Sequence, residues 1–232
     1  SEAEANLFKV LCPENASRVA YYNNGVDRNY FDPAQDRPSP YPDNDHVLVF
    51  TGAMDYWPNV DAVVWFAQTV FPLLRAEHPQ LRFYIVGGSP SASVVRLAQE
   101  PGIVVTGRVD DVRPYLHHAI AAVAPMRVAR GVQNKVLEAM AMEKVVMVSS
   151  LGLEGIAAAH QQEVLVVEEP ADYVTGLRQV INGEFAAMAK RARPFIASFF
   201  DWDESLPTVV NLLHSQGTFT AHTSAGVAVD GS

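Results

Sequence analysis

Short apolar runs recur along the central part of the chain and alternate with segments of helical periodicity. The apolar runs have the length of strands and lie at residues 46–50, 82–86, 103–105, 120–124, 145–148 and 164–167. Helical patterns lie near residues 59–77, 91–99, 111–118, 132–142, 155–160 and 171–181. Short, nearly continuous apolar strands that alternate with helices are typical of a parallel sheet covered on both faces. The pattern therefore predicts an α/β fold whose ligands bind at the carboxyl ends of the strands.

The segments on either side of this region are organised differently. Residues 1–12 open with a capping box, from Ser1 to Glu4, and predict a helix, and residues 18–22 predict a short strand. A stretch rich in Pro, Asp and Ser, residues 32–45, predicts an extended linker.

The C-terminal part predicts closing helices and a tail. Residues 184–214 have the pattern of one or two helices, with a break at Pro194 or near residues 201–203. Residues 215–232 are small and polar with few large apolar side chains, which is typical of a disordered tail.

The composition narrows the classes of function. The 232 residues carry a formal net charge of −9 at pH 7, which argues against a nucleic-acid partner because such binding needs clustered basic residues. The one cysteine excludes an internal disulfide, and the seven histidines have no metal-ligand spacing, so we expect no metal. No run approaches the roughly 18–20 apolar residues that span a bilayer, and no signal-peptide pattern is present. We therefore expect a cytoplasmic protein.

Glycines follow two of the predicted strands. Gly52 ends the first strand, and Gly87 and Gly88 end the second, where the missing side chain lets the backbone approach a ligand closely. An ordinary tight turn explains these glycines equally well. Neither segment completes the Gly-x-Gly-x-x-Gly pattern, and no Gly-Lys-Ser/Thr occurs, which argues against an NAD enzyme or a P-loop nucleotidase.

A polar loop follows the third predicted strand. The backbone near Arg108 and Val109 is suited to contact the edge of a base. Capping of the next helix by Asp110 or Asp111 is an equally good explanation for the loop.

Residues 127–142 carry the most specific chemistry. Two arginines and Gly131 come directly after a short apolar strand and precede a strong helix-forming run. A helix N-terminus presents unpaired N–H groups and a partial positive charge, which suit a phosphate. Lys135 adds a full positive charge, and Glu138 lies on the same helical face, where a carboxylate suits sugar hydroxyls. The segment therefore predicts a site for a phosphorylated sugar, most simply a nucleotide sugar.

A surface helix with a Lys–Glu pair is the alternative explanation for this segment. Such a pair contributes only a few tenths of a kcal/mol, and for an isolated helix it would be the better explanation. Here the helix follows a buried strand at the ligand edge of the predicted sheet, with Arg127 and Arg130 in the loop before it. We therefore favour a binding site.

These segments resemble one family, the family-4 (group 1) glycosyltransferases of the GT-B fold. The resemblance is to the C-terminal, donor-binding half of the family, a Rossmann-like domain, and covers roughly residues 1–214. Among these enzymes the chain is most similar to bacterial sugar transferases associated with exopolysaccharide and exosortase loci. The matching motifs are Asn24-Gly25-Val26-Asp27, Phe50-Thr51-Gly52, Val86-Gly87-Gly88, Val105-Thr106-Gly107-Arg108-Val109 and, most strongly, Val136-Leu137-Glu138-Ala139-Met140-Ala141.

The resemblance implies a retaining, metal-independent transfer from a nucleoside diphosphate sugar to a glycan or a lipid-linked acceptor. Glu138 matches the glutamate that binds the nucleotide ribose. The implied donor-binding residues are Gly52, Met54, Gly87, Arg108, Val109, Arg127, Arg130, Gly131, Val132, Gln133, Asn134, Lys135 and Glu138.

The chain departs from the family pattern at charged positions. The family commonly carries a second glutamate eight positions before the first, and this chain has Arg130 there. The family's Arg and Lys after the first strand are replaced by Ala53 and Pro58. We expect Arg127, Arg130 and Lys135 to supply the charge for the diphosphate instead.

The resemblance also implies a division of the chain. Residues 1–31 would be a remnant of the acceptor-binding domain, and residues 46–183 would form the nucleotide-sugar-binding domain. Catalytic groups are then expected in the missing domain, so that this chain alone would transfer little. It would self-associate through the face that the missing domain leaves, and a lipid-linked acceptor would bring it to the periphery of the inner membrane.

Two other functions remain open from the sequence. A sugar-nucleotide 2-epimerase on a similar fold would need acid and base carboxylates with histidines in the cleft, and the sequence has no evident cluster of that kind. A non-catalytic module that binds nucleotide sugar is the other alternative.

Overall fold

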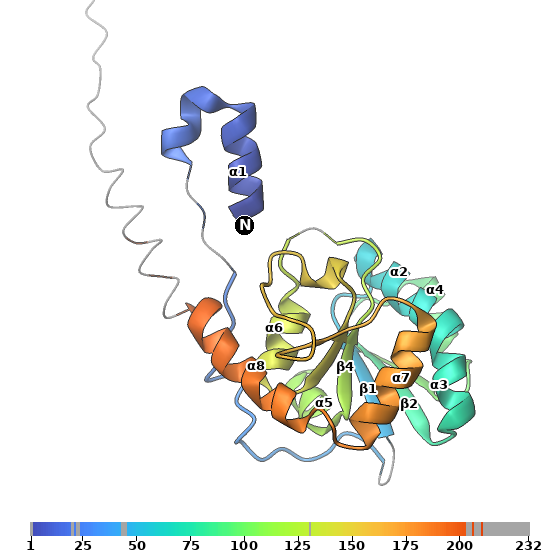
Figure 1. Cartoon of the computed structure of the whole chain (residues 1–232). Coiled ribbons are helices and arrows are strands. Elements are labelled where there is room, and N and C mark those ends of the chain that lie inside the picture. The colour runs from blue at the N-terminus through green and yellow to red at the C-terminus, as the bar shows by residue number, and fades with distance from the viewer. Residues whose placement is uncertain are drawn as a thin grey trace, which may run out of the picture.

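A six-stranded parallel sheet lies at the centre of the computed structural model, in the order β3-β2-β1-β4-β5-β6 (Figure 1). The structure describes residues 2–19, 21, 24–42, 46–129, 131–202, 206 and 210. The strands are β1 (His46–Thr51), β2 (Leu81–Val86), β3 (Ile103–Gly107), β4 (Ala121–Ala124), β5 (Val145–Val148) and β6 (Leu165–Val166). Each lies where the apolar pattern predicts a strand, so the predicted α/β fold is confirmed.

Helices cover both faces of the sheet (Figure 1). They are α2 (Trp57–Trp65), α3 (Phe71–Glu77), α4 (Ala92–Leu97), α5 (Arg113–His118), α6 (Asn134–Ala141), α7 (Pro170–Ile181) and α8 (Ala186–Phe199). A further helix, α1 (Glu2–Leu11), does not pack on the sheet (Figure 1). Short 3-10 segments lie at η1 (Pro13–Arg18) and η3 (Leu151–Leu153), and a π-helical turn, η2 (Phe66–Val70), joins α2 to α3. Pro72 follows this turn and has no N–H for an α-helical hydrogen bond, which accounts for the irregularity.

Alternate residues of each strand contribute to two separate hydrophobic cores. Leu48 and Phe50 of β1 point into the core beneath α2, α3 and α7, whereas Val47 and Val49 point into the core beneath α5, α6 and α8. This arrangement requires apolar residues at consecutive positions. It explains why the strands are continuous apolar runs and do not alternate with polar residues.

The segment that precedes the sheet is fastened to α8. The Arg193 guanidinium donates hydrogen bonds to the carbonyls of Arg28, at 2.9 Å, and of Ala141, at 2.6 Å. Val26 forms an isolated parallel bridge with Asp201, which also pairs with Arg28. One arginine therefore joins the connecting segment, α8 and the end of α6, the helix that carries the candidate site.

The helix predicted at residues 155–160 is wrong. The chain instead forms η3 and then bends at Gly155, where φ is +76°. A Cβ atom at this glycine would lie 3.0 Å from Cγ2 of Val132, a contact from a distant part of the chain. His160 forms an isolated bridge with Val164. Packing against Val132 thus favours a left-handed bend over the helix that the local pattern suggests.

The structure also corrects the predictions for both flanks. The strand predicted at residues 18–22 does not form in the part of it that is described: Arg18 ends η1, and Val19 and Tyr21 have no regular structure. Pro194 does not interrupt α8, which continues to Phe199; the helix instead ends before Asp201, which forms a bridge with Val26, as the other predicted break near residues 201–203 expects. Residues 32–42 lack helices and strands, as the linker prediction expects, while the predicted tail at 215–232 lies outside the described residues.

No helix in the described part of the chain has the length and apolar character needed to cross a bilayer.

Replacement of Phe66 by Ala tests the importance of the core beneath α2 and α7. The Phe66 ring is fully buried, with its centroid 4.8 Å from that of Phe83 and 5.4 Å from that of Tyr173. We expect F66A to lower the free energy of unfolding by about 3–5 kcal/mol, measured by urea titration.

The exposed Leu73 provides the matched control, and we expect L73A to change the free energy of unfolding by no more than about 0.5 kcal/mol. F66L serves if F66A does not fold. Equal stability of the wild type and both Phe66 variants would contradict this account of the core.

Candidate active site at the carboxyl edge of the sheet

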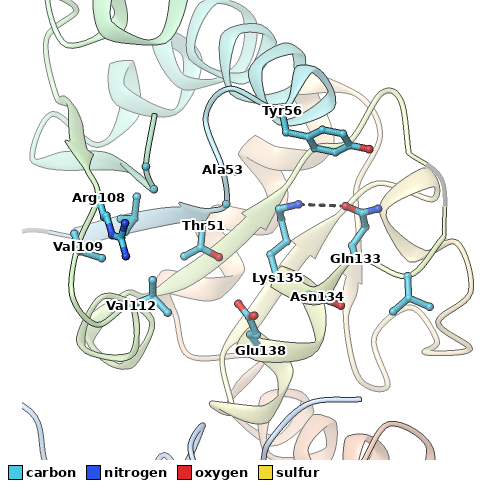
Figure 2. Close-up of a pocket in the computed structure, with 15 residues that line it drawn as sticks. Thr51, Ala53, Tyr56, Arg108, Val109, Val112, Gln133, Asn134, Lys135 and Glu138 are labelled. Atoms are coloured by element: carbon cyan, nitrogen blue, oxygen red, sulfur yellow. Dashed lines mark hydrogen bonds between the residues drawn. The ribbon is translucent and has the colours of Figure 1, made fainter. Parts of the chain in front are cut away.

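A cavity of about 560 Å³ opens at the carboxyl edge of the sheet (Figure 2). Strand order reverses at this point, because β1 has β2 on one side and β4 on the other. Open parallel sheets bind ligands at such a reversal, and the volume is in the range of small-molecule sites. The lining residues are Thr51, Gly52, Ala53, Tyr56, Val86, Gly87, Gly88, Arg108, Val109, Val112, Val132, Gln133, Asn134, Lys135 and Glu138.

Gly52 and Gly87 let the loops after β1 and β2 pack directly on each other. A Cβ atom on Gly87 would lie 1.7 Å from the carbonyl oxygen of Gly52, which no side chain can tolerate. A Cβ atom on Gly52 would lie 2.7 Å from Nδ2 of Asn59. The amide of Gly52 donates a hydrogen bond to the carbonyl of Val86 at 3.0 Å. Both glycines are therefore needed for loop packing, and this packing leaves the cavity open above them.

Lys135 brings a cation into the cavity from the first turn of α6. Its Nζ donates a hydrogen bond to Oε1 of Gln133 at 3.2 Å and lies 5.3 Å from the centroid of the Phe50 ring. Burial lowers the pKa of Lys135 to about 8, although the nearby Glu138 carboxylate acts in the opposite direction. An anion beside Nζ would favour the charged form of Lys135 and so oppose the effect of burial on its pKa.

Glu138 lies one helical turn further along α6, and its carboxylate faces the cavity (Figure 2). Burial raises the pKa of Glu138, and the Lys135 charge partly offsets that rise. The two side chains project to the same side because α6 buries Val136, Leu137 and Met140 on its opposite face. The cavity thus has a cation and a carboxylate at fixed spacing.

Gln133 and Asn134 connect the start of α6 to its surroundings. The Gln133 side chain is buried, accepts from Lys135 and donates from Nε2 to the carbonyl of Gly131 at 3.2 Å. Gly131 has φ +69°, a left-handed conformation that favours glycine. Oδ1 of Asn134 accepts from Nδ2 of Asn24 at 3.2 Å. The last contact joins the segment before the sheet to the edge of the cavity.

The other end of the cavity is more apolar. Val109 and Val112 line it together with Arg108 (Figure 2). Asp111 does not line it, because its carboxylate accepts from the amide of Arg113, the first residue of α5, and pairs with the Arg113 guanidinium at 2.7 Å. In the loop after β3, Asp111 therefore binds the start of α5, while Arg108, Val109 and Val112 line the cavity.

Nine of the thirteen residues predicted from the sequence line this one cavity. They are Gly52, Gly87, Arg108, Val109, Val132, Gln133, Asn134, Lys135 and Glu138. Gly131 is not a lining residue, but its carbonyl holds Gln133. Arg130 lies outside the described residues.

Met54 and Arg127 are not among the residues that line the cavity. Met54 is fully buried beneath the loop, and its backbone bonds to Gly88 and Ser91 instead of facing the cavity. The Arg127 guanidinium lies 3.7 Å from the Asp61 carboxylate and 5.8 Å from the Trp65 ring, both on α2. Arg127 therefore contacts α2, and its role in donor binding stays a prediction.

Six lining residues were not predicted as site residues: Thr51, Ala53, Tyr56, Val86, Gly88 and Val112. Thr51 and Val86 end their strands, a position that points to the ligand edge. Gly88 belongs to a glycine pair that was recognised from the sequence. The direction of the Tyr56 side chain has no local signal, since it depends on how α2 begins.

In the described part of the chain, no group of three or more His, Cys, Asp or Glu side chains is arranged to hold a metal ion.

The sheet order, the reversal at β1 and β4, and the cavity above it define a Rossmann-like domain. A family model described as "Glycosyl transferases group 1" matches residues 45–183. The chain belongs to this family. No curated protein matches the chain.

Solved structures of GT-B glycosyltransferases have the same fold. A glycosyltransferase from Rickettsia africae superposes with a TM-score of 0.70 at 16% identity, over 86% of this chain and 57% of its own. Alr3699/HepE from Anabaena, in complex with UDP and glucose, superposes with a TM-score of 0.68 at 15% identity, over 86% of this chain and 58% of its own. The chain thus spans less than three fifths of either protein.

A third structure is limited to one domain. The C-terminal domain of the group 1 family protein LpcC from Francisella tularensis superposes with a TM-score of 0.59 at 15% identity. The match covers 77% of this chain and 100% of that domain. The sheet and its helices therefore correspond to the C-terminal domain of a GT-B fold.

Replacement of Gly87 by Ala tests the packing of the two loops. The added methyl group would meet the Gly52 carbonyl oxygen, so we expect G87A to lower the free energy of unfolding by about 3 kcal/mol. Thermal and urea unfolding measure the change.

Gly88 is the matched control, because a Cβ atom there would meet only Cβ of Arg108, at 3.7 Å. We expect G88A to change stability by no more than about 0.5 kcal/mol. Equal stability of G87A and G88A would show that the loops do not pack as described.

Proposed function

We propose that the cavity binds a nucleoside diphosphate sugar and that the chain is the donor-binding part of a hexosyltransferase. The proposal extends to transfer with retention, without a metal, to a glycan or lipid-linked acceptor. The observation that carries it is the placement of Lys135 and Glu138 in one cavity, one turn apart on α6, at the strand-order reversal. Membership of the glycosyltransferase family and the UDP complex of a protein with the same fold support it.

In this proposal Lys135 contacts the diphosphate and stabilises the charge that develops on it when the sugar leaves. Such stabilisation by a fixed charge in a partly dry site is a large contribution to catalysis. The partial burial of Lys135 strengthens its attraction for an anion.

Glu138 accepts hydrogen bonds from the ribose hydroxyls, a role that suits a carboxylate that interacts with the nearby Lys135 charge but accepts no hydrogen bond from a described side chain. The base lies between Val109 and Val112 at the apolar end. The resulting order along the cavity is base, ribose and diphosphate.

Groups that bind the acceptor are proposed to lie outside this chain, which spans less than three fifths of the glycosyltransferases with the same fold. Donor binding is therefore the property to test on the 232-residue chain. Retention is tested on a longer form that transfers sugar, by NMR of the anomeric configuration in the product.

Calorimetric titration with UDP, GDP and ADP tests the proposal directly. We expect at least one of these nucleotides to bind, and E138Q to weaken that binding by about tenfold to a hundredfold, because a neutral amide accepts hydrogen bonds from hydroxyls less strongly. Glu154, an exposed carboxylate outside the cavity, provides the control E154Q. Absence of binding for all three nucleotides would exclude the proposed function.

The pH dependence of nucleotide affinity tests the role of Lys135. The pKa of Lys135 is about 8 in the free protein, and a bound diphosphate favours the charged form and raises that pKa. Affinity is therefore fully developed below pH 8 and falls as pH rises through 8, by up to about tenfold per pH unit until the pKa of the complex is reached.

Two variants separate the effect of this charge from other titrations. K135M removes the charge, so we expect weak binding that no longer falls above pH 8. K135R stays positively charged from pH 7 to pH 9.5, so its affinity for the nucleotide should not fall as pH rises through 8. A wild-type affinity that stays constant from pH 7 to pH 9.5 would contradict the role assigned to Lys135.

A further inference from the structure

We infer that Tyr56 forms the platform on which the sugar ring of the donor rests. The inference depends on the proposed function, and it assigns the end of the cavity that the nucleotide does not fill. Tyr56 lines the cavity and remains 55% exposed. A large aromatic side chain with that exposure at the rim of a binding site offers a ready contact surface.

The backbone of Tyr56 is held in place by the start of α2. Tyr56 is the N-cap residue of this helix, and its carbonyl accepts from the amides of Asn59, at 2.9 Å, and Val60, at 3.1 Å. Pro58 in the first turn further restricts the backbone. The ring is thus presented from a fixed point, although no described residue covers it fully.

The two ends of the cavity differ in chemistry, which gives the bound donor a direction. Figure 2 shows Arg108 and Val109 at one end and Tyr56 with Gln133 at the other, with Lys135 between them. The valine-lined end suits a flat base and offers few side chains that bind hydroxyls. A sugar therefore fits better at the end formed by Tyr56 and Gln133.

Lys135 supports the same direction. Its Nζ points toward Gln133, to which it donates, so an anion at Nζ lies nearer to the Gln133 end (Figure 2). The nucleoside then extends from the anion toward Val109, and the group on the other side of the diphosphate extends toward Tyr56. That group is the sugar.

The chemistry of Tyr56 and Gln133 matches a pyranose ring. One face of such a ring consists mainly of C–H groups and packs on an aromatic face, while its hydroxyls need polar partners. The Tyr56 hydroxyl has no hydrogen-bond partner among the described residues, and Nε2 of Gln133 uses one of its two N–H groups on Gly131. Both side chains therefore retain hydrogen-bonding capacity for the sugar hydroxyls.

Titration of UDP and UDP-glucose, and of GDP and GDP-mannose, into the wild-type chain and Y56A tests the inference. The readout is the ratio of the two dissociation constants, that of the nucleotide sugar to that of the free nucleotide. We expect Y56A to raise this ratio about fivefold to tenfold for the sugar that binds, because the stacking surface is lost, while affinity for the free nucleotide stays within twofold.

Two further variants complete the test. Y56F keeps the ring and should retain most of the wild-type ratio. W57A removes the next aromatic residue, which is 61% exposed and does not line the cavity, and should leave the ratio unchanged.

The outcomes separate this inference from the proposed function. If no nucleotide binds the wild-type chain, the proposed function fails and this inference fails with it. If UDP or GDP binds and Y56A leaves the ratio unchanged, only the role of Tyr56 is excluded. If Y56A weakens the free nucleotide as much as the nucleotide sugar, Tyr56 contacts the nucleotide and the assigned direction is overturned.

Discussion

Burial of a parallel sheet on both faces is the constraint on which the rest of the structure depends. It requires strands that are apolar at consecutive positions, and it places every strand-to-helix loop at the same edge. The cavity lies at that edge because the strand order reverses between β1 and β4. Helix α6 is oriented by the same burial, and its apolar face directs Lys135 and Glu138 upward into the cavity.

Lys135 and Glu138 lie in one cavity, and the free protein does not fully stabilise the charged form of either side chain. Burial lowers the pKa of Lys135 and raises that of Glu138, and each charge only partly compensates the other. Such opposite shifts in one cavity are common at functional sites. A ligand with an anionic group and hydroxyls would supply the missing partners, which agrees with the proposed donor.

Arg127, in the loop before α6, shows how a charged side chain can contact a neighbouring helix without lining the cavity. Arg127 was expected at the diphosphate, yet it contacts Asp61 and Trp65 of α2. Arg193 has a comparable structural role, since it joins the segment before the sheet to α6 and α8. Among the described residues that line the cavity, Lys135 and Arg108 are the cations, with Arg108 at one end and Lys135 between the two ends.

The sequence by itself determined the six strands. A strand that is buried on both faces is a continuous apolar run, and such a run is recognisable without knowing which strands lie beside it. It also determined the placement of Lys135 and Glu138, since helical geometry relates residues three positions apart. Only the tertiary structure decided the directions of Arg127 and Tyr56 and the bend at Gly155. In each case the deciding contact or helix start lies outside the local pattern: Asp61 and Trp65 for Arg127, the beginning of α2 for Tyr56, and Val132 for Gly155. A side chain in a loop has no periodicity to fix it, so its direction follows from the surfaces that folding brings beside it.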